Sequence, residues 1–264
     1  MKEREPLRVM AIRGVGNDHG DEHWKVKWLE AMFHGINRWD PDLSVEFDFV
    51  DYEDLFETAL DDGASLVSRL WLILGSDCLR WVDRRRRSRR ANNLAGELRW
   101  TAGMVVQWMS SDNVRRRSRE RLLKHLCAFQ PDILFAHSLG SLISYDTLAR
   151  DQSIATQHMT LVTFGSQLGN RCVQDRFPGK QVTELPVRNW FQFYNRHDDI
   201  FTARVRLKAN NYREIDTHFD LPGVGDHAAV SYHSHAAVSE HVWRPLLEPD
   251  RLRRVIETLD APIE

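Results

Sequence analysis

The sequence predicts an α/β fold, with a mostly parallel sheet flanked by helices and a helical insertion. Short apolar runs typical of buried strands alternate along the chain with runs of helical periodicity, an order that favours parallel strands joined by helices. Around residues 133–148 one such strand passes through a tight turn directly into a helix. At 264 residues the chain is also long enough to bury the core of one large α/β domain.

The elements follow in order from their patterns. The first strand is predicted at 7–12, an apolar run that ends in a glycine-rich turn, and the second at 43–50, where apolar residues alternate. A helix is predicted between them at 24–36, and a long helical pattern runs from 52 to 130. The remaining predictions are strands at 133–135, 159–164, 190–194 and 212–217, a helix at 142–148, and a closing helix at 238–247.

We expect a single domain over 1–264, because no linker or internal repeat divides the chain, and we interpret 63–121 as an insertion on it. A hydrophobic content of 42% and a charged content of 28% indicate a soluble globular protein. The cysteines, Cys78, Cys127 and Cys172, are far apart, so the expected compartment is a reducing cytoplasm without disulfides. The charged start is not expected to be a signal peptide, and no apolar run reaches the roughly 20 residues that span a bilayer.

Ser138 stands at the apex of the strand–turn–helix unit. The sequence FAHSLGSLISY, residues 135–145, has the small residues Ala136 and Gly140 on either side of it, where a cramped turn has no room for bulk. This pattern is typical of a nucleophile elbow, although the usual G-x-S-x-G here begins with alanine. The sequence therefore indicates Ser138 as a nucleophile, and the alternative is an ordinary strand-to-helix turn.

A serine hydroxyl needs a base, usually histidine, and a carboxylate that orients the base. In hydrolases built on this elbow the acid and then the histidine follow the serine along the chain, beyond the carboxyl ends of later strands. Asp198 lies just past the strand predicted at 190–194 and is the expected acid. Asp199 beside it is expected to cap a turn or helix, and that reading also remains open for Asp198.

Several histidines follow the last predicted strand. His227 is the expected base, because it lies in a glycine-rich loop between the last strand and the last helix. His233 and His235 remain alternatives, although they lie nearer to the final helix. A histidine and aspartate metal site is a further alternative, but no spacing of the H-E-x-x-H kind supports it. We therefore expect neither a metal nor a cofactor.

An oxyanion hole would supply backbone N–H donors to the negative oxygen of a tetrahedral intermediate. The N–H of Leu139, directly after Ser138, is the first expected donor, and the N–H of Val15, in the turn 14–17 after the first strand, is the second. The alternative for this turn is phosphate binding, but it lacks the G-x-G-x-x-G spacing and a Walker lysine.

Taken together, these motifs resemble the α/β-hydrolase superfamily in its lipase and esterase branch. The segments that carry the resemblance are RGVGN (13–17), LFAHSLGS (134–141), VTFGSQL (162–168) and NRHD (195–198). The resemblance implies an α/β-hydrolase fold with Ser138 as nucleophile, Asp198 as orienter and His227 as base. Gln167 departs from the family by replacing a common proline, and Arg13 by standing where histidine is usual.

The insertion resembles a lid of such lipases in its position. Tryptophans lie beside arginine-rich runs at 80–90 and 115–121, a combination that suits an anionic membrane surface. The alternatives are nucleic-acid binding, which nothing else in the chain supports, and core-facing tryptophans beneath a solvated basic face. The tryptophans concerned are Trp71, Trp81, Trp100 and Trp108.

The expected activity is hydrolysis of a carboxylic ester, of a lipid or another acyl substrate, through an acyl-enzyme. An acyltransferase would use the same three residues, because water and an alcohol compete for one acyl-enzyme. A non-catalytic binding or regulatory protein that keeps the fold is the third possibility. The expected location is the cytoplasm, with peripheral contact to a membrane if the insertion binds one.

Overall fold

Six parallel strands form one sheet in the order β2-β1-β3-β4-β5-β6. The computed structural model describes residues 5–14, 23–56, 95–151, 153–198, 202–222 and 225–248. The strands are β1 Leu7–Ile12, β2 Val45–Val50, β3 Ile133–His137, β4 Thr160–Phe164, β5 Asn189–Asn195 and β6 Tyr212–Thr217. The predicted α/β class with a mostly parallel sheet is confirmed at this level.

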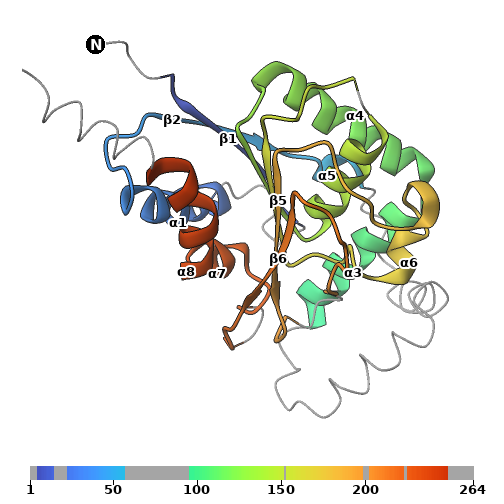
Figure 1. The fold of residues 1–264 in the computed structure, drawn as a ribbon. Helices are drawn as coiled ribbons and strands as arrows, with labels where there is room; N and C mark the ends of the chain where they lie inside the picture. Colours follow the sequence, from blue (N-terminus) through green and yellow to red (C-terminus); the bar gives the residue numbers. More distant parts are fainter. Residues whose placement is uncertain are drawn as a thin grey trace, which may run out of the picture.

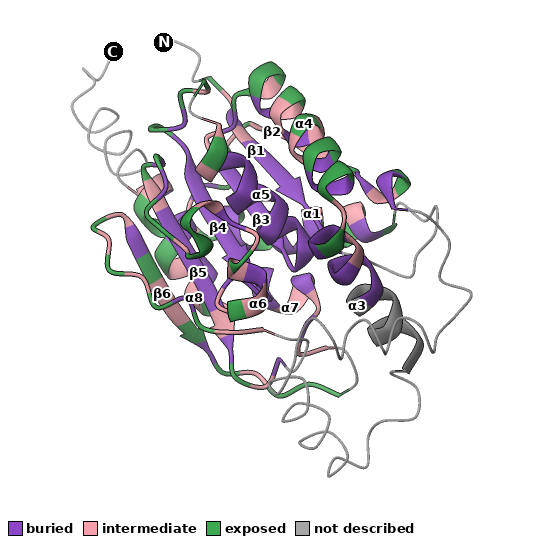
Figure 2. Ribbon diagram, turned by 90° about the vertical axis from the view of Figure 1, so that its right-hand side faces the viewer, coloured by how far each residue is buried: buried purple, intermediate pink, exposed green. Residues whose placement is uncertain are grey.

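Successive apolar residues of the central strands pack into two different hydrophobic clusters, one on each face of the sheet. In β1, Met10 and Ile12 belong to one cluster, and Val9 and Ala11 belong to the other. Both faces of the central strands are therefore buried, which explains why these strands are apolar runs in the sequence instead of alternating ones. Figure 2 shows the central strands buried, with the exposed residues of α4 on the outside.

Helices cover both faces (Figure 1). One face carries α1 His23–Asn37, α7 Ala229–His233, α8 Ala236–Val238 and the π-helical turn Ser239–Trp243. The other face carries α3 Ala95–Ser110, α4 Asp112–Phe129, α5 Leu139–Arg150 and α6 Arg171–Gln174. Short 3₁₀ turns lie at Glu53–Leu55 and Pro178–Lys180.

The C-terminal region differs most from its prediction. The helix expected at 238–247 begins earlier, at Ala236, and its α-helical pattern is interrupted by the π-helical turn. A short helix, α7, precedes it and was not predicted, because five residues are too few for a helical period to be recognised.

Part of the predicted insertion packs into the core. Trp108 of α3 is fully buried, and Val114 and Leu122 of α4 pack in the same cluster as the elbow helix α5. The side chain of Trp100 and the whole of residues 57–94, with Trp71, Trp81 and the arginine run 80–90, lie outside the described residues.

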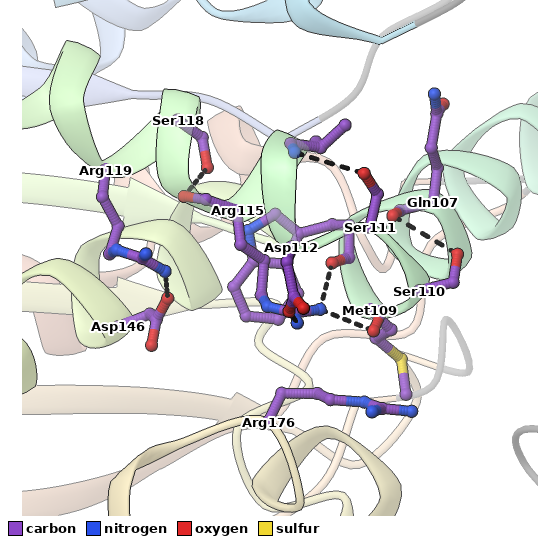
Figure 3. A network of polar contacts seen from close by, with 12 residues as sticks. Gln107, Met109, Ser110, Ser111, Asp112, Arg115, Ser118, Arg119, Asp146 and Arg176 are labelled. Carbon is purple, nitrogen blue, oxygen red and sulfur yellow. Dashed lines mark hydrogen bonds and ion pairs between the residues drawn. The ribbon is translucent and has the colours of Figure 1, made fainter.

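The second arginine run, 115–121, is largely engaged within the molecule. The carbonyl oxygens of Trp108 and Met109 are left without helical partners because α3 ends there. Nη1 of Arg115 donates to both of them, at 2.9 and 2.6 Å (Figure 3). Arg119 pairs with the buried Asp146 of α5 at 2.6 Å. Two further arginines of the run form ion pairs, Arg116 with Glu120 and Arg121 with Asp54. The buried contacts of Arg115 and Arg119 give these two residues a structural role.

None of the described helices is both long enough and apolar enough to cross a membrane.

Candidate active site

The topology itself marks one end of the sheet. The chain leaves β1 for β2 on one side and then returns to β3 on the other side, so the strand order reverses between β1 and β3. Ligands of open parallel sheets bind beyond the carboxyl ends of the strands at such a switch point. Gly14 lies just beyond the end of β1, and Ser138 directly follows β3.

Ser138 occupies a strained backbone conformation between β3 and α5. Its φ of 51° and ψ of −122° lie in a region that residues with a side chain rarely adopt. The Ser138 N–H donates to the carbonyl oxygen of Phe164 at 3.0 Å, and its own carbonyl oxygen accepts from the N–H of Ser141 at 2.9 Å. The neighbouring strand and the first turn of the helix thus hold the strained residue in place.

Two glycines make room for this turn. A Cβ atom on Gly140 would lie 2.6 Å from the carbonyl oxygen of Ile12, so the elbow can approach β1 this closely only with glycine there. A Cβ atom on Gly14 would lie 2.5 Å from the Cβ of Ser138. The small residue expected at position 140 therefore has a direct steric cause.

The structure brings Ser138, His227 and Asp198 together. Nε2 of His227 lies 3.0 Å from Oγ of Ser138, and Nδ1 lies 2.9 and 2.8 Å from the two carboxylate oxygens of Asp198. All three residues are buried. With its proton on Nδ1 and directed to the carboxylate, neutral His227 presents an unprotonated Nε2 that can accept the serine proton.

The other histidines considered as the base lie elsewhere. His233 is buried among the rings of Trp28, Phe135 and Phe164, with ring centroids 4.8 to 4.9 Å away. His235 caps α8 and accepts from the N–H of Ala237 at 3.1 Å. Asp199, the expected cap beside Asp198, lies outside the described residues.

His137, the residue before Ser138, forms a hydrogen bond with the loop that carries His227. Its Nε2 lies 2.7 Å from the carbonyl oxygen of His227, to which it donates as a neutral imidazole. Burial, and then the neighbouring His227, lowers the pKa of His137 well below its usual value, so the ring stays uncharged. Its ring also stacks on Phe164, with centroids 5.4 Å apart. The turn at Ser138 and the loop that carries His227 are therefore fixed to each other.

Of the two expected oxyanion donors, only Leu139 lies among the described residues. Leu139 is the first residue of α5, and an N–H at that position has no acceptor within the helix. Val15 lies outside the described residues, but the loop that leads to it is anchored. Tyr52 donates to the carbonyl oxygen of Arg13 at 2.7 Å, and the Arg13 guanidinium pairs with Glu53 at 2.5 Å.

Three polar residues contact the site or its loops although the sequence did not indicate them as site residues. Tyr232 of α7 donates from its hydroxyl to Asp198 at 2.8 Å. Asn195, at the end of β5, donates from Nδ2 to the carbonyl oxygen of Phe219 at 2.9 Å. This bond connects the loop that carries Asp198 to the segment before His227. Gln167 places Nε2 3.4 Å from Oγ of Ser138. Asn195 and Gln167 lie in the motif segments, whereas nothing local distinguishes Tyr232.

In the described ranges, no three histidine, cysteine, aspartate or glutamate side chains lie close enough together to hold a metal ion. Comparison of the chain with family models, curated proteins and solved structures finds no match. The interpretation of the site therefore depends on its geometry. A buried serine, a neutral histidine and a carboxylate in hydrogen-bonded sequence can pass a proton from the serine oxygen to the histidine.

Proposed function

We propose that this protein is a serine hydrolase of the α/β-hydrolase type, which cleaves a carboxylic ester of a lipid or another acyl substrate. The observation that carries the proposal is the hydrogen-bonded path from Asp198 through His227 to Ser138, with the serine in a strained turn at the switch point of the sheet. Each contact in this path has the distance that proton transfer from a serine requires.

In the first half of the reaction, Oγ of Ser138 attacks the ester carbonyl carbon while Nε2 of His227 takes the hydroxyl proton. Asp198 stabilises the imidazolium that forms. The C–O bond to the alcohol then breaks, and His227 returns the proton to the leaving oxygen, which leaves an acyl group on Ser138.

In the second half, water gives its proton to His227 and attacks the acyl carbon, so that the acid is released and Ser138 recovers its proton. The N–H of Leu139 is the proposed donor to the oxyanion in both halves, with Val15 as the second donor. One such donor contributes about 3 kcal/mol to transition-state stabilisation. No step of this reaction uses a metal or a cofactor.

The test is covalent labelling with a fluorophosphonate, which forms an O–P bond to an activated serine as fluoride leaves. We expect labelling of the wild-type protein and none of Ser138→Ala. The matched control is Ser144→Ala, because Ser144 on α5 is also fully buried and, within the described part of the chain, its hydroxyl has no hydrogen-bond partner. Labelled Ser138→Ala, or a wild-type protein that is folded and unlabelled, would refute the proposal.

A series of p-nitrophenyl esters then reports on the substrate class. We expect a burst of p-nitrophenol equal to the enzyme concentration when acyl-enzyme hydrolysis is slower than its formation. The acyl length with the highest kcat/KM defines the acyl chain that the site prefers.

A further inference from the structure

Asp198 has a second buried donor besides His227. The hydroxyl of Tyr232 donates to Oδ2 of Asp198 at 2.8 Å, and the same oxygen lies 2.8 Å from Nδ1 of His227. The ring of Tyr232 is fully buried, stacked on Phe164 with centroids 5.4 Å apart and in edge contact with Phe219 at 5.0 Å. These rings hold the hydroxyl on the carboxylate.

The two partners of this contact keep complementary protonation states. Burial, and then the negative charge of Asp198, raises the pKa of Tyr232 well above its usual value, so the phenol remains a donor. A buried carboxylate needs such donors, because its charge has left water. A hydrogen bond to the ionised form also favours that form and draws part of the charge away from other partners.

We propose that Tyr232 is a positioning residue that, through Asp198, lowers the proton affinity of His227. This inference depends on the proposed function only for its consequence for catalysis. The phenol shares the negative charge of Asp198, so the carboxylate stabilises the His227 imidazolium less. His227 therefore stays neutral, and able to accept the proton of Ser138, at a lower pH than it would without the phenol.

Other titratable groups surround this path, and the test must leave them in place. The ring of His137, at the end of β3, lies 4.7 Å from that of His227. Asp226 precedes His227, and its carboxyl feels the charges of Asp198 and His197. Tyr194 of β5 also feels the charge of Asp198. A change at Tyr232 alone keeps all of these groups, so a shift can be assigned to the phenol.

The experiment compares wild type with Tyr232→Phe, which removes the hydroxyl and keeps the ring. Two quantities are measured against pH: the fluorophosphonate labelling rate, and the ¹⁵N chemical shifts of the His227 imidazole. In the variant we expect the His227 midpoint and the acidic limb of the labelling profile to move up by about half a pH unit or more. At pH values below the midpoint of the acidic limb, the labelling rate of Tyr232→Phe should be at least about threefold lower than that of wild type.

The matched control is Tyr212→Phe. Tyr212 is likewise buried and donates from its hydroxyl to the carbonyl oxygen of Val205 at 2.9 Å, but on β6 and away from the site. A merely structural loss would lower the amount of folded protein in both variants and leave the midpoint in place. We expect the control to keep both the midpoint and the limb of the wild type.

A second substitution tests the direction of the shift in the His227 midpoint and keeps a hydroxyl at position 232. Incorporation of 3,5-difluorotyrosine at position 232 keeps the ring and makes the hydroxyl a stronger donor, so the His227 midpoint should move down. Unchanged midpoints in folded Tyr232→Phe and fluorinated proteins would overturn the inference. The NMR midpoint needs no reaction, so shifted midpoints in a wild type that is never labelled would sustain the role of Tyr232 and refute only the hydrolase proposal.

Discussion

Gly14 lies directly against Ser138, although the two residues belong to different strand ends. A Cβ atom on Gly14 would be 2.5 Å from the Cβ and 3.1 Å from the Oγ of Ser138. Both distances are shorter than van der Waals contact, and the strained serine backbone has little freedom to yield. We therefore expect Gly14→Ala to displace the Ser138 hydroxyl and slow fluorophosphonate labelling by about 100-fold or more.

Gly179→Ala is the control for this prediction. Gly179 has a φ of 66°, so alanine there strains the backbone, but its added Cβ atom would meet nothing closer than 3.9 Å. It should cost about 1 kcal/mol of unfolding free energy and leave labelling unchanged. Equal labelling rates for Gly14→Ala and wild type would mean that the glycine serves only the fold.

The strands and the elbow could be predicted because their determinants are local. β1 and β3 are apolar runs with both faces buried, and such runs stand out in the sequence. Ser138 could be singled out because small residues flank it within a strand–turn–helix pattern. The close approach of Gly140 to β1 is the physical cause of that pattern.

The partners of Ser138 could be predicted only as a short set of candidates. Five histidines follow β6, and three of them were candidates for the base. Only tertiary packing brings His227 to Ser138 and places His233 among aromatic rings. Tyr232 could not be found at all, since it lies on a five-residue helix and reaches Asp198 across 34 positions of the chain.

The arginines at 115–121 show how composition alone misleads. Arg115 and Arg116 are adjacent in sequence, but Arg115 is buried against the end of α3 while Arg116 is exposed and pairs with Glu120 at 2.8 Å. We expect Arg115→Ala to lower the unfolding free energy by about 2–3 kcal/mol, because two buried carbonyl oxygens lose their donor.

Arg116→Ala should change the same quantity by no more than about 0.5 kcal/mol, because an exposed ion pair contributes little. Urea unfolding of both variants measures the contrast. Similar costs for the two substitutions would show that Arg115 acts as a surface residue.

The contact from His137 to the His227 loop also predicts a measurable effect. His137→Phe keeps an aromatic ring against Phe164 but removes the donor 2.7 Å from the His227 carbonyl oxygen. A less fixed base should slow labelling of Ser138 by about five- to tenfold. A labelling rate equal to that of wild type, in a protein with the same unfolding midpoint, would contradict this role.

The burial of His233 predicts how stability depends on pH. Within the described part of the chain its two ring nitrogens have no hydrogen-bond partner, and burial lowers its pKa from 6.5 to about 3. Below pH 6.5 the unfolded chain therefore binds a proton at this site that the folded protein does not bind until about pH 3. Stability is lost as the pH falls through this interval, and at pH 5 the loss from this one group is about 2 kcal/mol.

His233→Leu removes the titrating group and leaves an apolar side chain among Trp28, Phe135 and Phe164. We expect urea unfolding free energies of wild type and variant to diverge as the pH falls from 7 to 5, with the variant gaining about 2 kcal/mol relative to wild type. The pKa of His137 is also lowered, mainly by burial and then by the neighbouring His227, and both causes are present in both proteins. His233 is the smallest contributor to that shift, so most of the His137 contribution cancels in the comparison. Parallel stability curves over this range would contradict the prediction, because they would mean that folded His233 accepts its proton as readily as the unfolded chain does. A buried imidazole without a hydrogen-bond partner among the described residues should accept a proton less readily.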